Sequence, residues 1–189
     1  MRVDKGCVAS DSRGTTVVEF ALILPIFLVL VFGIFEYGFR MDQINSVRTG
    51  AAETARAASV GAWGDHSPCP SPGLPANSAA AKLVCLAKAN TGLAEVHNNP
   101  DNPTEIKEED KIRVAIVLGS GGYEVGGQVI VCMQYQLQSI SGLNELVGMT
   151  DQVTFTKSPM RIDNLNAAQP LAAGQEEPLP GANWSECTP

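Results

Sequence analysis

The segment from Phe20 to Phe35 contains sixteen consecutive residues without a charge, most of them large and apolar. Extending it from Val17 to Phe39 adds only Glu19 and Glu36 and gives 23 residues. A helix of that length, at about 1.5 Å rise per residue, crosses a hydrocarbon core of roughly 30 Å. The sequence therefore predicts a transmembrane helix over residues 15–39.

Two simpler interpretations of this segment leave something unexplained. A secretory signal peptide would need a small-x-small cleavage site directly after Phe35, and the nearest candidate, Ala55-Arg56-Ala57, lies about twenty residues later. A plain single-pass anchor accounts for the length but not for Glu19. A carboxylate inside a membrane span costs a few kcal/mol, so it usually has a function and a partner.

A new α-amino group would be a suitable partner for Glu19. Cutting the chain after Gly14 would create one on Thr15, one helical turn before the carboxylate. In a medium of low dielectric constant, a close pair of opposite charges recovers much of the penalty that each charge incurs alone. The spacing thus indicates a processing and assembly device.

The charge balance excludes one class of partner. The chain has a net charge of −7, and the first fourteen residues carry +1 of it, which leaves −8 on the remainder. Nucleic-acid binding needs a basic face that releases phosphate counterions, so we expect no nucleic-acid partner. Three arginines follow the span within residues 40–56 and match the three basic residues of the leader, so charge does not settle the topology.

Residues 40–62 continue the helical pattern beyond the span. Residues at alternating spacings of three and four form a seam of coiled-coil type, made of Met41, Ile44, Arg48, Ala51, Ala55, Ala58 and Ala62. Its small side chains would let a second helix approach closely, or would cover the protein's own sheet. Both alternatives stay open.

Residues 63–189 predict a small outer domain of α+β class. A proline-rich loop over 65–77 precedes a short helix from Ser78 to about Asn90, with Asn77 as its cap. Residues 98–110 are rich in acids and prolines and predict a loop. Alternating apolar residues then predict a three-stranded antiparallel sheet, with strands that start near residues 112, 129 and 153. The composition of the tail, residues 167–189, predicts an irregular segment that wraps around the domain.

The five cysteines divide at the span. Cys7 lies in the leader, whereas Cys69, Cys85, Cys132 and Cys187 all follow the span, which suggests two disulfides in an oxidising, extracytoplasmic compartment. Three connectivities are possible. We favour Cys132–Cys187, because Cys132 points away from the apolar face of its strand, where a tail could cover it, and Cys69–Cys85.

The arrangement at the N-terminus resembles the prepilin leader of type IV-like pilins, and most of all the TadE-like pseudopilins of tight-adherence (Flp) pili. The resemblance covers roughly residues 13–61, and residues 154–161 resemble the family more loosely. It rests on Arg13-Gly14, Val18-Glu19-Phe20-Ala21-Leu22, Leu24-Pro25, Gly33, Glu36-Tyr37-Gly38 and the alanine-rich run from Ala51 to Ala58.

The resemblance implies that residues 1–14 are a leader, removed after Gly14 by a membrane aspartyl prepilin peptidase. Thr15 becomes the N-terminus, and Glu19, followed by Phe20, becomes the fifth mature residue, which neutralises the N-terminal amine of a subunit as helices stack. The implied partners are the peptidase, other pilin-like subunits, the membrane assembly machinery and membrane lipid. The expected function is that of a minor pseudopilin in pilus assembly, held in the cell membrane or built into a surface pilus.

No residue pattern indicates catalysis. The two histidines lie in loop-like sequence without further ligands at zinc-site spacing, and no nucleophile elbow is present. The glycine-rich turn at 119–127 lacks the third glycine of a dinucleotide fingerprint and the Lys-Ser/Thr of a phosphate loop. We therefore expect no enzyme activity, metal, cofactor or small-molecule substrate. The alternative function is a single-pass envelope protein whose outer domain binds another protein or the cell wall.

Overall fold

The computed structural model describes residues 13–64, 71, 73–75, 77–93, 97–99, 102–106, 111–139 and 152–189. For residues 13–15, 97–99 and 102–106 it describes the backbone alone. The chain divides into two compact units, Met1–Gly38 and Phe39–Pro189, referred to below as unit 1 and unit 2. The combination of a long apolar helix and a small antiparallel sheet confirms the predicted α+β class.

The first helix, α1, runs from Arg13 to Ser59 over 47 residues and contributes to both units. Pro25 lies inside its apolar half. Proline has no backbone N–H, so the carbonyl of Ala21 loses the donor that an α-helix would give it. The helix ends before Gly61, which has a φ of 70°, a left-handed conformation that glycine adopts without strain.

The sheet of unit 2 has four antiparallel strands in the order β5-β4-β3-β6. They are β3 (Ile112–Leu118), β4 (Gln128–Gln136), β5 (Val153–Arg161) and β6 (Gly174–Gln175). The three strands predicted from alternating apolar residues are all present. The fourth, β6, was not predicted, because two residues within the tail carry no alternation; it pairs with β3 next to Ala115 and Ile116.

The prediction of a loop over residues 98–110 is wrong in part. Strands β1 (His97–Asn99) and β2 (Asn102–Ile106) pair antiparallel as a separate two-stranded sheet. The composition of these strands disfavours a sheet, and Pro103 cannot donate to a ladder. In a ribbon of two strands each strand has one unpaired edge, so a proline can face outward without removing a ladder bond. The remaining residues of the predicted loop lie outside the described residues.

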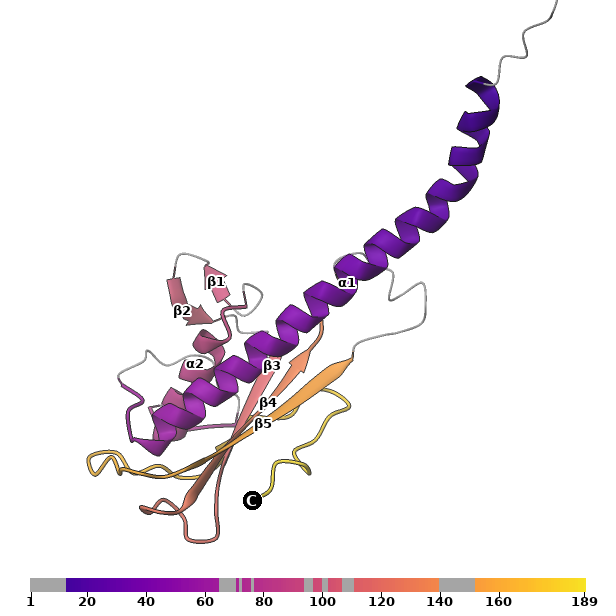
Figure 1. Cartoon of the computed structure of the whole chain (residues 1–189). Helices are drawn as coiled ribbons and strands as arrows, with labels where there is room; N and C mark the ends of the chain where they lie inside the picture. The colour runs from indigo at the N-terminus through magenta and orange to yellow at the C-terminus, as the bar shows by residue number, and fades with distance from the viewer. Residues whose placement is uncertain are drawn as a thin grey trace, which may run out of the picture. The chain divides into compact units, whose positions relative to one another are not determined.

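One face of the sheet packs against α1 and α2 (Ala79–Asn90), as Figure 1 shows. The apolar side chains of β3 and β4 that face this side are fully buried with alanines of α1. The two helices approach closely at Gly50: a Cβ added there would lie 2.9 Å from the methyl group of Thr91 and 3.0 Å from the carbonyl oxygen of Ala87. Glycine at this position therefore permits the close packing of the helices.

The cap of α2 differs from the prediction by one residue. Ser78, not Asn77, is the N-cap, and its hydroxyl accepts a hydrogen bond from the backbone N–H of Ala81 at 3.1 Å. Asn77 instead has a φ of 64°, the left-handed conformation that asparagine tolerates better than most residues. Both residue types favour helix starts, so composition alone did not decide between two adjacent candidates.

The predicted seam on α1 is correct for Ala51, Ala55 and Ala58, but not for Ala62, which is exposed and lies beyond the end of the helix. Ala51, Ala55 and Ala58 are fully buried in the core of unit 2, so this part of the helix covers the protein's own sheet. Met41 and Arg48, however, are exposed. The buried stripe passes instead through Gln43, Val47 and Thr54, and the two polar positions could not be recognised from apolar spacing alone.

Candidate functional site

All four residues predicted for processing and assembly lie within α1. Gly14 and Thr15 fall in its first turn, and Glu19 and Phe20 in the next. Thr15 and Glu19 are four residues apart, which places them on one face of the helix, about 6 Å apart along its axis. The side chains of Glu19 and Phe20 are exposed, so both are accessible to groups from outside the chain.

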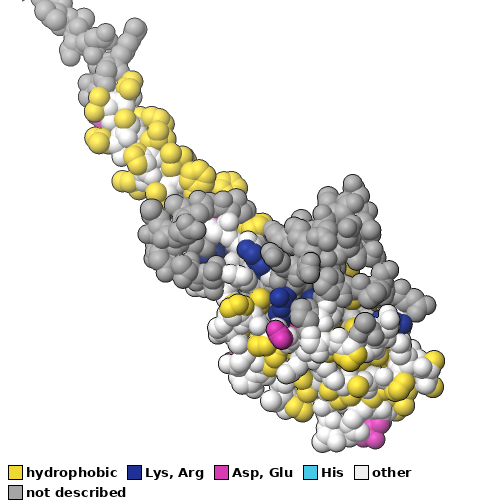
Figure 2. Space-filling view, turned by 180° about the vertical axis from the view of Figure 1, so that it is seen from behind, with side chains coloured by type: hydrophobic (Ala, Val, Ile, Leu, Met, Phe, Trp, Pro, Cys, Tyr) yellow, Lys and Arg dark blue, Asp and Glu magenta, His cyan; other side chains and the backbone are white. Residues whose placement is uncertain are grey.

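The apolar side chains around Glu19 are also exposed, on every side of the helix. Leu22 is 71% exposed, Ile26 66% and Ile34 74%. Figure 2 shows hydrophobic side chains along the visible face of this segment. Among the described residues, one helix is long and apolar enough to cross a membrane, and it is α1. This supports single-pass membrane anchoring.

One polar side-chain group and one polar backbone group lie close together inside the apolar segment. One is the carboxylate of Glu19. The other is the carbonyl of Ala21, which Pro25 leaves without its helical donor. In hydrocarbon both groups need partners, which neighbouring helices or other polar groups can supply.

The comparison with known families covers this same segment. The family model described as TadE-like protein matches residues 14–56. The N-terminal segment is similar to this family. The match begins at Gly14, contains Glu19 and Phe20, and ends within α1, so it includes neither the sheet nor any cysteine. No curated protein and no solved structure matches the chain.

The TadE-like match implies involvement in the function of the tight-adherence pilus and association with components of pilus assembly. Proteins of this pilus-associated family are generally non-enzymatic. Within the described part of the chain, no three His, Cys, Asp or Glu residues come together in a way that could hold a metal ion.

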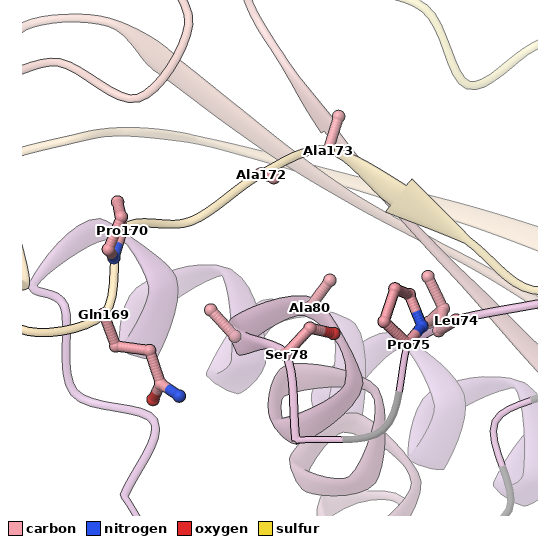
Figure 3. Close-up of a pocket in the computed structure, with 9 residues that line it drawn as sticks. Leu74, Pro75, Ser78, Ala80, Gln169, Pro170, Ala172 and Ala173 are labelled. Atoms are coloured by element: carbon pink, nitrogen blue, oxygen red, sulfur yellow. The ribbon is translucent and has the colours of Figure 1, made fainter.

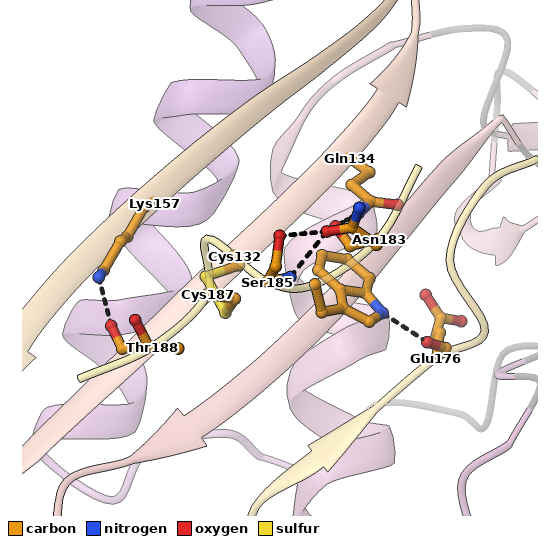
Figure 4. Close-up of a disulfide and its surroundings, with 9 residues drawn as sticks. Cys132, Gln134, Lys157, Glu176, Asn183, Ser185, Cys187 and Thr188 are labelled. Carbon is orange, nitrogen blue, oxygen red and sulfur yellow. Dashed lines mark hydrogen bonds between the residues drawn. A yellow bond between two sulfur atoms is a disulfide. The ribbon is translucent and has the colours of Figure 1, made fainter. Parts of the chain in front are cut away.

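The second group of candidate residues, the cysteines, lies in unit 2. Cys132 and Cys187 form a disulfide, as the direction of Cys132 on its strand predicted. Figure 4 shows the tail crossing the face of the sheet opposite to the helices, with the disulfide beneath it. Cys85 is also disulfide-bonded. Cys69 and Cys7 lie outside the described residues, so the pairing of Cys69 with Cys85 stays a prediction.

Polar contacts that the sequence did not reveal fix the rest of the tail. Glu176 and Lys88 form an ion pair at 2.8 Å, and both side chains are fully buried. The second carboxylate oxygen of Glu176 accepts a hydrogen bond from the backbone N–H of Val114 at 2.9 Å. The indole N–H of Trp184 donates to the carbonyl oxygen of Glu176 at 2.9 Å (Figure 4). No spacing rule connects a helix lysine with a glutamate 88 residues later.

A second side chain of the sheet holds the tail farther along. Gln134, on the same face of β4 as Cys132, is buried. Its carboxamide accepts from the backbone N–H of Leu179 at 3.1 Å and donates to the carbonyl oxygen of Asn183 at 2.6 Å. The tail is therefore held to the outer face of the sheet through backbone groups as well as through the disulfide.

A small pocket of about 260 Å³ lies between the start of α2 and the tail. Figure 3 shows Leu74, Pro75, Pro170 and several alanines around it. Ser78 already caps α2, and Gln169 accepts hydrogen bonds from Trp63 and Lys82. The polar side chains that line this pocket therefore have structural roles, and none of them is a nucleophile with a neighbouring base.

Proposed function

We propose that the chain is a minor pseudopilin of a tight-adherence (Flp, type IVb-like) pilus, processed by a prepilin peptidase and active in pilus assembly. The observation that carries the proposal is the coincidence of the TadE-like match with the exposed carboxylate of Glu19, which lies among exposed apolar side chains in the first turns of α1. The alternative, a single-pass envelope protein whose outer domain binds another protein or the cell wall, gives Glu19 no function.

Processing would supply a positively charged partner for the carboxylate of Glu19. Hydrolysis of the Gly14–Thr15 peptide bond consumes one water, leaves a carboxylate on Gly14 in the released leader and creates an ammonium group on Thr15. Thr15 is one turn from Glu19 in its own chain. The same carboxylate, exposed on the helix surface, can equally meet the ammonium group of a neighbouring subunit when helices stack side by side.

The orientation follows from the chemistry of unit 2. The Cys132–Cys187 disulfide is stable in an oxidising compartment and is rare in the cytosol. We therefore place unit 2 on the extracytoplasmic side, with residues 1–14 as the leader on the cytoplasmic side until they are cleaved. Residues 15–39 span the membrane, α1 continues beyond the span to Ser59, and residues 63–189 form the outer domain.

The experiment has two measurements. Mass spectrometry of the membrane-extracted protein should give Thr15 as the N-terminal residue, and a terminus at Met1 or Ala58 would contradict the proposed processing. Glu19→Ala should insert into the membrane at least as well as the wild type, because a charge leaves the span, and should abolish pilus assembly.

Glu53→Ala is the matched control, because Glu53 is an exposed glutamate on the same helix but in unit 2. It should assemble pili normally. If Glu19→Ala, like the control, leaves both membrane insertion and pilus assembly unchanged, the pseudopilin proposal is wrong. The single-pass envelope protein would then be the better description.

A further inference from the structure

We propose that Asn183 carries an N-linked glycan, and that the first sugar of this glycan lies in a small hollow beside Phe155. The inference rests on the part of the proposed function that places unit 2 on the extracytoplasmic side, and it does not require pilus assembly. Both residues belong to unit 2, one in the tail and one in β5, and lie beyond the segment that the TadE-like match covers.

The tail contains an acceptor sequence for asparagine glycosylation. In Asn183-Trp184-Ser185 a serine follows the asparagine by two positions, and the residue between them is not proline. Asn102 is the one other asparagine of the chain with a hydroxyl residue at this spacing, but Pro103 lies between the two and excludes it. Matches of three residues arise often by chance, so the inference depends on where the fold places Asn183.

The structure leaves the amide nitrogen of Asn183 available. Asn183 and Ser185 are exposed, whereas Trp184 between them is half-buried. The side-chain oxygen of Asn183 accepts from the backbone N–H of Ser185 at 2.9 Å and from the Ser185 hydroxyl (Figure 4). A backbone N–H can only donate, so the atom that it meets is the amide oxygen. The nitrogen, Nδ2, is the atom to which a glycan is attached, and none of the hydrogen bonds described for this residue uses it.

The backbone around Asn183 is held in place. The carboxamide of Gln134 donates to the carbonyl oxygen of Asn183 at 2.6 Å, and the Cys132–Cys187 disulfide anchors the chain four residues later. The acceptor asparagine therefore has a fixed position on the outer face of the sheet and is exposed without any unfolding of unit 2.

A hollow of about 230 Å³ adjoins this asparagine. Val153 and Phe155 supply its apolar lining, and Asn183, Ser185 and Glu186 are among its polar lining. Pockets for drug-sized ligands occupy roughly 300–1,000 Å³, so this hollow suits a single sugar ring. The C–H face of a sugar packs favourably on the electron-rich face of an aromatic ring, and its hydroxyls need polar neighbours. The hollow is thus an observation independent of the acceptor sequence, and it lies where the first sugar would be attached.

The attachment exchanges one bond for another at the anomeric carbon of the sugar. Nδ2 of Asn183 attacks this carbon in a glycosyl diphospholipid, which is the co-reactant, and the C–N bond forms. The bond from the same carbon to the diphosphate oxygen breaks, the lipid diphosphate leaves with the electron pair, and Nδ2 loses one proton to the solvent. The step needs no oxidant or reductant. It needs a membrane glycosyltransferase that acts on the side of the membrane where unit 2 lies.

The test uses the full-length protein isolated from the membranes of its own host. Cleavage after lysine and arginine, with reduction, gives one peptide of residues 162–189 and another of residues 89–107, which contains Asn102. In the wild type, mass spectrometry should show a glycan on the first peptide, with fragmentation placing the added mass on Asn183, and none on the second. Asn183→Gln and Ser185→Ala should each lose the glycan, whereas Ser185→Thr should keep it, because threonine supplies the same hydroxyl.

Asn164→Gln is the matched control. Asn164 is an exposed asparagine in the same peptide, without a serine or threonine two positions later, so this variant should keep the glycan. Formation of the Cys132–Cys187 disulfide, checked by peptide mapping without reduction, shows that each variant has folded.

A double-mutant cycle tests the contact between the sugar and Phe155. Asn183→Gln removes the glycan and should lower the urea concentration at which unit 2 unfolds. The decrease should be smaller in a Phe155→Ala background, because the aromatic face that the sugar contacts is already absent. Equal decreases in the two backgrounds would overturn the placement of the sugar in the hollow.

Three results would overturn the modification itself. They are an unmodified peptide 162–189 in the wild type, added mass on a residue other than Asn183, and a glycan that persists in Ser185→Ala. With the Cys132–Cys187 disulfide formed, none of these results bears on the orientation of unit 2, the processing of Gly14 or pilus assembly. A reduced pair of cysteines in the wild type would instead contradict the proposed orientation, so the failures of the two proposals can be told apart.

Discussion

The two units use the same residue types in opposite environments. In unit 1, Leu22 and Ile34 are 71% and 74% exposed, whereas in unit 2 Leu83 and Ile116 are almost completely buried. Burial of apolar surface is the main favourable term in folding. Unit 2 obtains this term from its own chain, but the apolar surface of unit 1 requires lipid or other helices. The environment, not the composition, separates the two regions.

The charged residues show the same contrast. In unit 2, Lys88 and Glu176 form a buried ion pair, so each charge has its partner within the same chain. In unit 1, no residue that the structure describes forms an ion pair with Glu19. A charge that has its partner within the fold acts on stability, whereas one that needs an outside partner can act on assembly. The contrast predicts that substitutions in unit 2 change its unfolding and substitutions in unit 1 do not.

The largest effect on unit 2 should come from Lys88→Met. This change leaves the buried carboxylate of Glu176 without its counter-charge, which costs about 3–5 kcal/mol when one partner of a buried pair is removed. Urea unfolding of the detergent-solubilised protein, followed by tryptophan fluorescence, measures the loss. Both tryptophans, Trp63 and Trp184, lie in unit 2, so the signal reports that unit alone.

The double variant Lys88→Met/Glu176→Leu separates the charge from the packing. It should be more stable than Lys88→Met, because no unpaired charge remains in the interior. A single variant as stable as the wild type would show that the pair is not essential to unit 2 and would weaken the contrast with Glu19.

The disulfide should have the next largest effect. Replacing both Cys132 and Cys187 by serine removes a link between residues 55 apart in the chain, and such a link contributes about 2–4 kcal/mol, mainly by restricting the unfolded state. The polar contacts of Gln134 and Glu176 remain, so the variant should still fold. The same urea experiment measures the difference, and membrane insertion should be unchanged. An unfolding midpoint equal to that of the wild type would contradict this expectation.

Regular patterns made part of this structure predictable. The strands that begin at Ile112, Gln128 and Val153 follow an alternation that depends only on neighbouring residues. The position of Cys132 opposite the apolar face of β4 likewise follows from the two-residue period of a strand, and this period predicted the disulfide with the tail. The apolar run of α1 was recognisable from length and composition alone.

Contacts between distant segments were not predictable. Strand β6 exists because β3 offers an edge to the tail, and nothing in the sequence Gly174-Gln175 indicates a strand. Gln43 occupies a buried position on α1 through its hydrogen bond to Gln138, 95 residues away, so an apolar pattern misses it. For the processing site, local spacing around Gly14 and Glu19 carries the prediction, and the partner of the carboxylate lies outside the chain's own fold.

The smallest and most direct test uses one substitution in both regions. Ala55 is fully buried in unit 2, and Ala21 is exposed on the apolar half of the same helix. Ala55→Leu inserts three carbon atoms into a filled core and should destabilise unit 2 by about 1–3 kcal/mol in the urea experiment. Ala21→Leu adds apolar surface to a segment that already contacts lipid, so unit 2 should unfold as in the wild type and insertion should be slightly stronger. Equal destabilisation by the two substitutions would mean that the apolar half of α1 contributes to the folding of unit 2, and the two regions could no longer be treated as independent.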